Sequence, residues 1–212
     1  MKRKVPASRI DEVVYNSHEF CINTITREIY LHGQVHYGCD DDGYCGIDYR
    51  SATTFIKNLT LLDRQSHDDI VIHMVSGGGD WNYGMAIYDA IRSAKSHVTI
   101  IAYAHARSMT SIILQAADTR VLMPNCIVLL HHGWLGTDDR CEAVVSQVDQ
   151  CKIEMKAMVD IFVDKCCGSE GFDGKKPSQV RSFINRKLQY KQDWILDADQ
   201  AIYYGLADIK DE

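Results

Sequence analysis

This sequence of 212 residues lacks the long apolar runs of a membrane protein. No stretch approaches the ~18 consecutive apolar residues of a membrane-spanning helix. The basic N-terminus, residues 1–6, is not followed by the apolar segment of a secretory signal peptide. Positive charge is also scarce, since 23 Lys and Arg stand against 29 Asp and Glu and leave a net charge of −6. We therefore expect a cytoplasmic protein that binds neither membranes nor nucleic acid.

Cysteine pairs with metal-binding or redox spacing are also missing. The eight cysteines include no CxxC pair and are too sparse for a disulfide scaffold, so we expect reduced thiols. Cys39 and Cys45 flank an acidic turn at residues 40–43, but the ligand spacing of a calcium loop is absent and no metal site is predicted. The role of this loop, up to Ile47, stays open. A GxxxxGK[ST] phosphate loop is likewise absent.

What the chain does contain is the pattern of one α/β domain covering residues 1–212. Hydrophobic residues make up 46% and charged residues 25%, as in globular proteins. Strand patterns at residues 29–35, 70–75, 98–104, 120–123 and 126–130 alternate with helical stripes, which predicts a largely parallel sheet covered by helices. A long helix is expected at about residues 138–167. At ~1.5 Å per residue it spans roughly 40 Å, so part of its apolar stripe is expected to face another subunit.

Two predicted strand-to-helix junctions carry candidate chemistry, because the start of a helix leaves backbone N–H groups unpaired. Residues 76–79 place three glycines after the strand at 70–75, which suits either an ordinary flexible turn or close approach to a substrate. Ser108 lies between the strand at 98–104 and an apolar helix that begins at Met109. A serine there commonly caps the helix, but it can also act as a nucleophile if a base is near.

Histidines follow another predicted strand and supply a candidate base. His131 and His132 come directly after residues 126–130, and imidazole is the usual base for a serine nucleophile. Such a histidine needs a carboxylate to orient it, and Asp193, Asp197 and Asp199 are candidates that spacing alone does not separate.

Several motifs together resemble ClpP, the caseinolytic serine peptidase family, between about residues 29 and 208. The glycines at 78–79 and the hexapeptide GMAIYD at 84–89 match the family's turn and following helix in sequence and spacing. Residues 106–109 resemble the nucleophile motif, residues 123–125 the segment before the base, and residues 204–208 the family's C-terminal ending.

The resemblance implies specific roles for residues of this chain. Ser108 would be the nucleophile, His131, six residues after Asn125, the base, and Asp193 the orienting carboxylate. The backbone N–H groups of Gly79 and Met109 would form the oxyanion hole. No cofactor would be needed.

The resemblance also implies the ClpP/crotonase-like fold of stacked ββα units with a long protruding handle helix at about 138–167. The chain would be a serine endopeptidase that needs no ATP itself. It would form stacked homo-oligomeric rings that enclose peptide or unfolded protein, fed by an ATP-driven unfoldase. Methionines 155 and 158 with Val159 and Phe162 are expected partly in the interface between rings.

Some positions depart from the family's pattern. Gly77 and Gly133 stand where the family has prolines, and the N-terminal segment 1–28 does not match well, so docking of an unfoldase is in doubt. These departures predict a divergent member, of the kind that a virus or mobile element carries. Two alternatives remain: an inactive structural or regulatory ring subunit, and a crotonase-type acyl-CoA enzyme.

Overall fold

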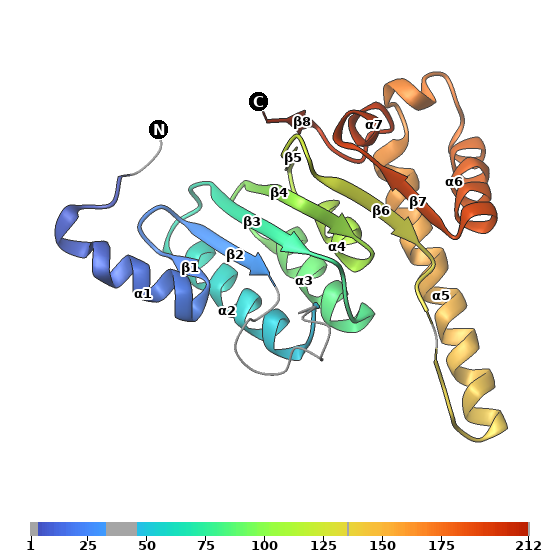
Figure 1. Cartoon of the computed structure of the whole chain (residues 1–212), viewed down its shortest axis with the longest axis horizontal. Helices are drawn as coiled ribbons and strands as arrows, with labels where there is room; N and C mark the ends of the chain where they lie inside the picture. Colours follow the sequence, from blue (N-terminus) through green and yellow to red (C-terminus); the bar gives the residue numbers. More distant parts are fainter. Residues whose placement is uncertain (1–3, 33–45, 135, 212) are drawn as a thin grey trace.

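The computed structural model describes residues 4–32, 46–134 and 136–211, which form a mixed sheet with helices around it (Figure 1). The strands are β1 (Ile22–Asn23), β2 (Glu28–His32), β3 (Ile70–Ser76), β4 (Val98–Arg107), β5 (Thr119–Leu122), β6 (Ile127–His131), β7 (Asp193–Leu196) and β8 (Ile209–Lys210). The helices are α1 (Ile10–Phe20), α2 (Tyr49–Gln65), α3 (Trp81–Ser93), α4 (Met109–Leu114), α5 (Cys141–Cys166), α6 (Pro177–Lys191) and α7 (Ala198–Tyr203). The expected α/β class is confirmed.

The sheet is mainly parallel, as the alternation of strands and helices predicted. Its order is β1-β2-β3-β4-β5-β8, and β6 pairs with both β4 and β7. Strand β4 is long enough to serve two partners: its first half pairs with β5 and its second half, from His105, pairs with β6. Ala104 lies between the two halves with a positive φ of 37°. Strand β4 therefore changes its pairing partner at Ala104, and β6 lies beside the C-terminal end of β4.

Helices cover one face of β2, β3 and β4 because their apolar residues recur at three- and four-residue steps. In α2 the buried stripe includes Ala52, Phe55, Leu59 and Leu62, as the sequence predicted. The strands alternate to match, and Ile72 of β3 is fully buried in the same core. Figure 1 shows α2, α3 and α4 along this face, so the ends of β3 and β4 lead directly into α3 and α4.

The C-terminal elements gather at one end of the sheet. Figure 1 shows β6, β7, α6 and α7 beside the C-terminal half of α5, and α5 packs on α6 while α7 packs on β6 and β7. The side chains of α5 that are buried all lie in its second half, from Met158 to Cys166. The first half projects away from the body of the chain, where Val145 and Ile153 are exposed.

Two expectations for the C-terminal half need correction. Helix α5 begins at Cys141 instead of residue 138, because Arg140 occupies the N-cap in extended conformation. Val159 and Phe162, expected between rings, are already 3% and 0% exposed within the single chain.

A buried arginine ties the C-terminal tail to the sheet. Arg120 of β5 is 8% exposed, and its Nε donates to the Asp208 carboxylate at 3.0 Å. Its Nη1 donates to the Gln115 side chain at 2.7 Å and to the Gly205 carbonyl at 2.8 Å. The charge and most of the guanidinium donors are therefore satisfied although the group is out of water.

The described part of the chain contains no helix long and apolar enough to cross a membrane. The acidic loop at residues 39–45, and the last part of the strand expected at 29–35, lie outside the described residues. Short elements that the sequence analysis did not identify are α1, β1, β7 and β8.

Candidate active site

Ser108 sits in a sharp turn between β4 and α4. Its backbone has φ 53° and ψ −126°, a conformation that L-residues adopt only where the surrounding structure enforces it. The turn is held by the Ser108 N–H, which donates to the Leu129 carbonyl of β6 at 2.9 Å. Although Ser108 occupies the N-cap position of α4, its side chain makes no capping hydrogen bond. The simple capping interpretation is therefore wrong, and the hydroxyl points elsewhere.

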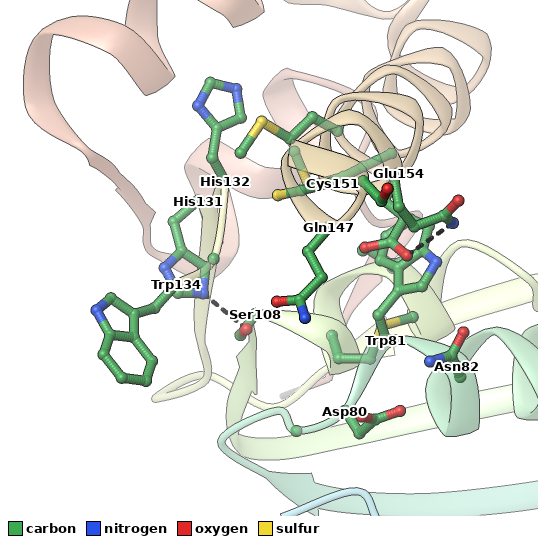
Figure 2. Close-up of a pocket in the computed structure, with 18 residues that line it drawn as sticks. Asp80, Trp81, Asn82, Ser108, His131, His132, Trp134, Gln147, Cys151 and Glu154 are labelled. Atoms are coloured by element: carbon green, nitrogen blue, oxygen red, sulfur yellow. Dashed lines mark hydrogen bonds between the residues drawn. The ribbon is translucent and has the colours of Figure 1, made fainter. Parts of the chain in front are cut away.

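The hydroxyl of Ser108 contacts His131, the last residue of β6. The distance from His131 Nε2 to Ser108 Oγ is 2.7 Å, a short hydrogen bond that Figure 2 marks with a dashed line. The two residues meet because β6 pairs with the end of β4, with Arg107 opposite Leu129. A serine hydroxyl and an imidazole in this geometry can exchange a proton directly.

Asp193 lies on the other side of the same imidazole. Strand β7 runs antiparallel to β6, and the pairing places Asp193 opposite His131. The Asp193 carboxylate is 3.6 Å from His131 Nδ1, close enough for an ion pair but longer than a hydrogen bond. Its side chain is half exposed.

The two other carboxylate candidates are engaged elsewhere. Asp197 caps α7 by accepting the Gln200 N–H at 2.8 Å. Asp199 pairs with Lys210 at 2.6 Å. Of the three aspartates that the sequence left open, Asp193 is the one in contact with His131.

His132 points away from Ser108 in Figure 2, whereas His131 points toward it. The side chain of His132 is partly buried, and this burial, together with the nearby charge of His131, lowers its pKa below the ordinary value. The neighbouring histidine is therefore held neutral at pH 7 and does not contact the serine.

The glycine turn after β3 packs directly against this centre. Gly78 has φ 115°, and a Cβ built on it would lie 2.5 Å from the Ser108 Cβ. Ile47 donates its N–H to the Gly78 carbonyl at 2.7 Å and accepts the Asp80 N–H at 2.9 Å. Both bonds belong to a parallel bridge between Ile47 and Gly79, and they use the Gly78 carbonyl and the Asp80 N–H instead of the backbone groups of Gly79. In such a bridge the N–H of Gly79 points away from Ile47. It is one of two amides, with that of Met109 at the start of α4, that flank the serine turn.

A pocket of about 750 Å³ opens beside Ser108 and His131, between the start of α3 and one face of α5. Apart from Ser108 and His131, the wall of the pocket is mostly apolar toward the core and polar along the projecting part of α5. The other lining residues are Gly79, Asp80, Trp81, Asn82, Met109, Ile112, His132, Gly133, Trp134, Ser146, Gln147, Gln150, Cys151, Glu154, Met155 and Met158. Figure 2 shows the labelled members around the opening.

The family model for Clp protease matches residues 44–209 of this chain. The chain belongs to the Clp protease family. The match begins after the N-terminal segment, which the sequence analysis had already set apart as divergent.

Curated relatives of this family member are ATP-dependent Clp protease proteolytic subunits. The protein from Deinococcus radiodurans is 26% identical over 165 residues, covering 76% of this chain and 74% of its own length. The protein from Borrelia garinii subsp. bavariensis is 24% identical over 184 residues, covering 86% and 82%. A mutant of ClpP1 from Listeria monocytogenes superimposes with a TM-score of 0.68 at 20% identity, covering 89% of this chain and 93% of that one. The fold of this chain is thus the ClpP fold.

The Clp-family centre holds no obvious metal site. Among the described residues no three His, Cys, Asp or Glu side chains are grouped to hold an ion. The described cysteines are all unpaired, and burial raises the pKa of Cys126 to about 11 and that of Cys166 to about 12. These two thiols are therefore protonated at pH 7 and poor nucleophiles.

The pocket wall of this Clp-family member is the part that the sequence analysis missed. The contributions of α5 lie three and four residues apart, from Gln147 through Cys151 and Glu154 to Met158, and so share one helix face. That spacing could have identified the face. It could not show that the face meets α3 and α4, because those contacts arise only when the chain folds.

Proposed function

We propose that this chain is a serine endopeptidase subunit, with Ser108 as nucleophile, His131 as base and Asp193 as the group that orients the base. The observation that carries the proposal is the 2.7 Å contact between His131 Nε2 and the Ser108 hydroxyl, which makes no capping hydrogen bond and lies in a strained turn. Membership of the Clp protease family supports the same reaction. No residue in this arrangement requires a cofactor.

The geometry supports acyl transfer in two stages. Ser108 Oγ attacks the peptide carbonyl while His131 Nε2 takes its proton, and the histidine then gives that proton to the leaving amine. Asp193 beside Nδ1 favours the tautomer with a free Nε2 lone pair and stabilises the imidazolium that forms. Water then repeats the sequence on the acyl-enzyme and releases Ser108.

The negative oxygen of each tetrahedral intermediate needs fixed donors. The N–H of Met109, at the first position of α4, has no earlier carbonyl within the helix to bond to. The N–H of Gly79 points away from Ile47, which occupies its neighbours. These amides are our candidates for the oxyanion hole, and removal of one such donor costs about 3 kcal/mol in comparable hydrolases.

Assembly into rings that enclose the active sites is part of the same proposal. The projecting half of α5 exposes the side chains of Val145 and Ile153, at 55% and 64%. A second copy of the chain would bury them. The relatives are named as proteolytic subunits of an ATP-dependent protease, so we infer that an ATP-driven unfoldase supplies unfolded substrate.

Hydrolysis of a short fluorogenic peptide by the purified chain tests the chemistry. The Ser108→Ala variant should lose at least about 10³-fold in kcat. Ser182→Ala, an exposed serine on α6, is the matched control and should keep full activity. Activity that survives in Ser108→Ala, or a parent protein without any activity after assembly into rings, would contradict the proposal and favour an inactive subunit.

A further inference from the structure

The pocket beside Ser108 has two different ends. Toward the core, Met109, Ile112 and Met158 are all at most 5% exposed and give an apolar base. Toward the projecting half of α5, the wall is formed instead by the polar side chains of Gln150 and Glu154. A substrate side chain entering from the serine would thus meet apolar atoms first and polar atoms farther out.

The charge of this pocket is negative. Among the described residues that line it there is no Lys or Arg, whereas Asp80 and Glu154 are present. Asp80 caps the N-terminus of α3, since its carboxylate accepts the Tyr83 N–H at 3.1 Å. Glu154 has a neutral neighbour instead: Gln150 Nε2 donates to its Oε1 at 3.0 Å. The Glu154 side chain is half-buried in the wall of the pocket.

Nearby lysines do not neutralise Glu154. Lys152 pairs with Asp149 at 2.8 Å, and Lys156 pairs with Asp160 at 2.9 Å. Both pairs lie on the side of α5 turned away from the lining stripe, because their positions fall between those of the lining residues. In the view of Figure 2, Ser108 and His131 lie toward one side of the pocket and Glu154, Trp81 and Asn82 toward the other.

We propose that Glu154 selects a substrate residue with a long apolar stem and a cationic tip, lysine or arginine, in this pocket. The stem lies over the methionines and Trp81, and the tip reaches the carboxylate. A leucine side chain would fill the apolar part of the pocket but would leave the Glu154 carboxylate without a cationic partner. An acidic side chain would be repelled by that carboxylate. This inference rests on the proposed peptidase function and names Glu154 as a specificity-determining residue for it.

The test compares two fluorogenic peptides that differ only in arginine or citrulline before the scissile bond. Citrulline keeps the shape of arginine and lacks its charge. The parent should cleave the arginine peptide with a kcat/KM about two- to fivefold higher, the size expected of a partly exposed ion pair. The ratio should fall toward one as salt is added.

Variants assign the preference to one carboxylate. Glu154→Gln should bring the arginine-to-citrulline ratio to about one, because arginine loses the carboxylate that distinguishes it from citrulline. Glu154→Lys should reverse the preference. Glu142→Gln, an exposed acid in the first turn of the same helix, removes the same charge outside the pocket and should behave as the parent.

Three results would overturn the inference. A ratio of one in the parent would do so and leave the peptidase proposal intact. If Asp80→Asn loses the preference for arginine while Glu154→Gln keeps it, the preference depends on Asp80 and not on Glu154. Absence of cleavage of either peptide, with Ser108 unreactive, would remove the proposed function and the inference together.

Discussion

Gly78 lies behind Ser108, and its missing side chain sets where the hydroxyl can be. Gly78→Ala should cost about 1–3 kcal/mol of unfolding free energy from its positive φ. In addition, the new methyl, 2.5 Å from the Ser108 Cβ, should push the serine off His131 and abolish most peptidase activity. Urea unfolding and peptide hydrolysis measure the two effects.

Gly168 provides the matched control for that substitution. It has φ 86° and open space around its Cβ position, so Gly168→Ala carries the backbone strain without the clash. We expect a destabilisation no larger than that of Gly78→Ala, together with full activity. Equal activity loss in both variants would show that strain alone, and not contact with Ser108, explains the effect.

Asp193 should act through His131 and not through the fold. Asp193→Asn keeps the shape of the side chain but removes the charge that favours the productive tautomer, so kcat should fall about 10²-fold or more with little change in KM. Asp197→Asn should be silent because asparagine also caps helices. The reverse pattern in steady-state kinetics would contradict the role assigned to Asp193.

The candidates Ser108 and His131 could be proposed from the sequence because their motifs are local. The glycine turn, the serine junction and the histidine six positions after Asn125 each occupy a short segment. The unusual backbone of Ser108 and the closeness of Gly78 could not be predicted, since both depend on how β3, β4 and β6 are placed side by side. The same holds for Glu154, whose partner surface is distant in the chain.

At the scale of elements, the pairing of β6 with β7 is what brings Asp193 to His131. Strand β7 is only four residues long, and its alternation of exposed Asp193 and Ile195 with buried Trp194 and Leu196 is too brief to distinguish from a loop. The strands that the sequence did predict are longer and more apolar. Long-range antiparallel pairing of a short edge strand therefore had to come from the structure.

The link between β5 and the C-terminal tail predicts a pH dependence of stability. Burial alone would raise the pKa of Asp208, but the hydrogen bonds and charge of Arg120 outweigh it and lower the pKa below 3.8. A carboxyl whose folded pKa is depressed contributes stability that is complete above the unfolded pKa and is lost as the pH falls through the folded value.

Asp208→Asn tests this dependence. At pH 7 the variant should have a lower free energy of unfolding than the parent, because Arg120 keeps a buried charge without its partner. The difference should begin to shrink below about 3.8, the ordinary pKa of an aspartate, and should be smallest once the pH has fallen through the lower pKa of Asp208 in the folded chain. Asp199→Asn, at an exposed pair, should show no difference at either pH. A gap that widens in acid would contradict the assignment.

At the scale of the whole molecule, the projecting half of α5 should hold copies of the chain together. Ile153→Glu places a charge at a 64% exposed apolar position and should shift the protein to smaller species in light scattering at micromolar concentration. Ile153→Leu keeps the apolar surface and should assemble like the parent. A parent that is a stable, active monomer would contradict the ring proposal.

The most direct measurement of the central claim is the site of covalent labelling by a fluorophosphonate, located by mass spectrometry. We predict one adduct, on Ser108, that forms in the parent and in His132→Ala and is nearly lost in His131→Ala, because His131 is the histidine hydrogen-bonded to the serine hydroxyl. An adduct on another residue, or labelling of Ser108 that is indifferent to His131, would contradict the account.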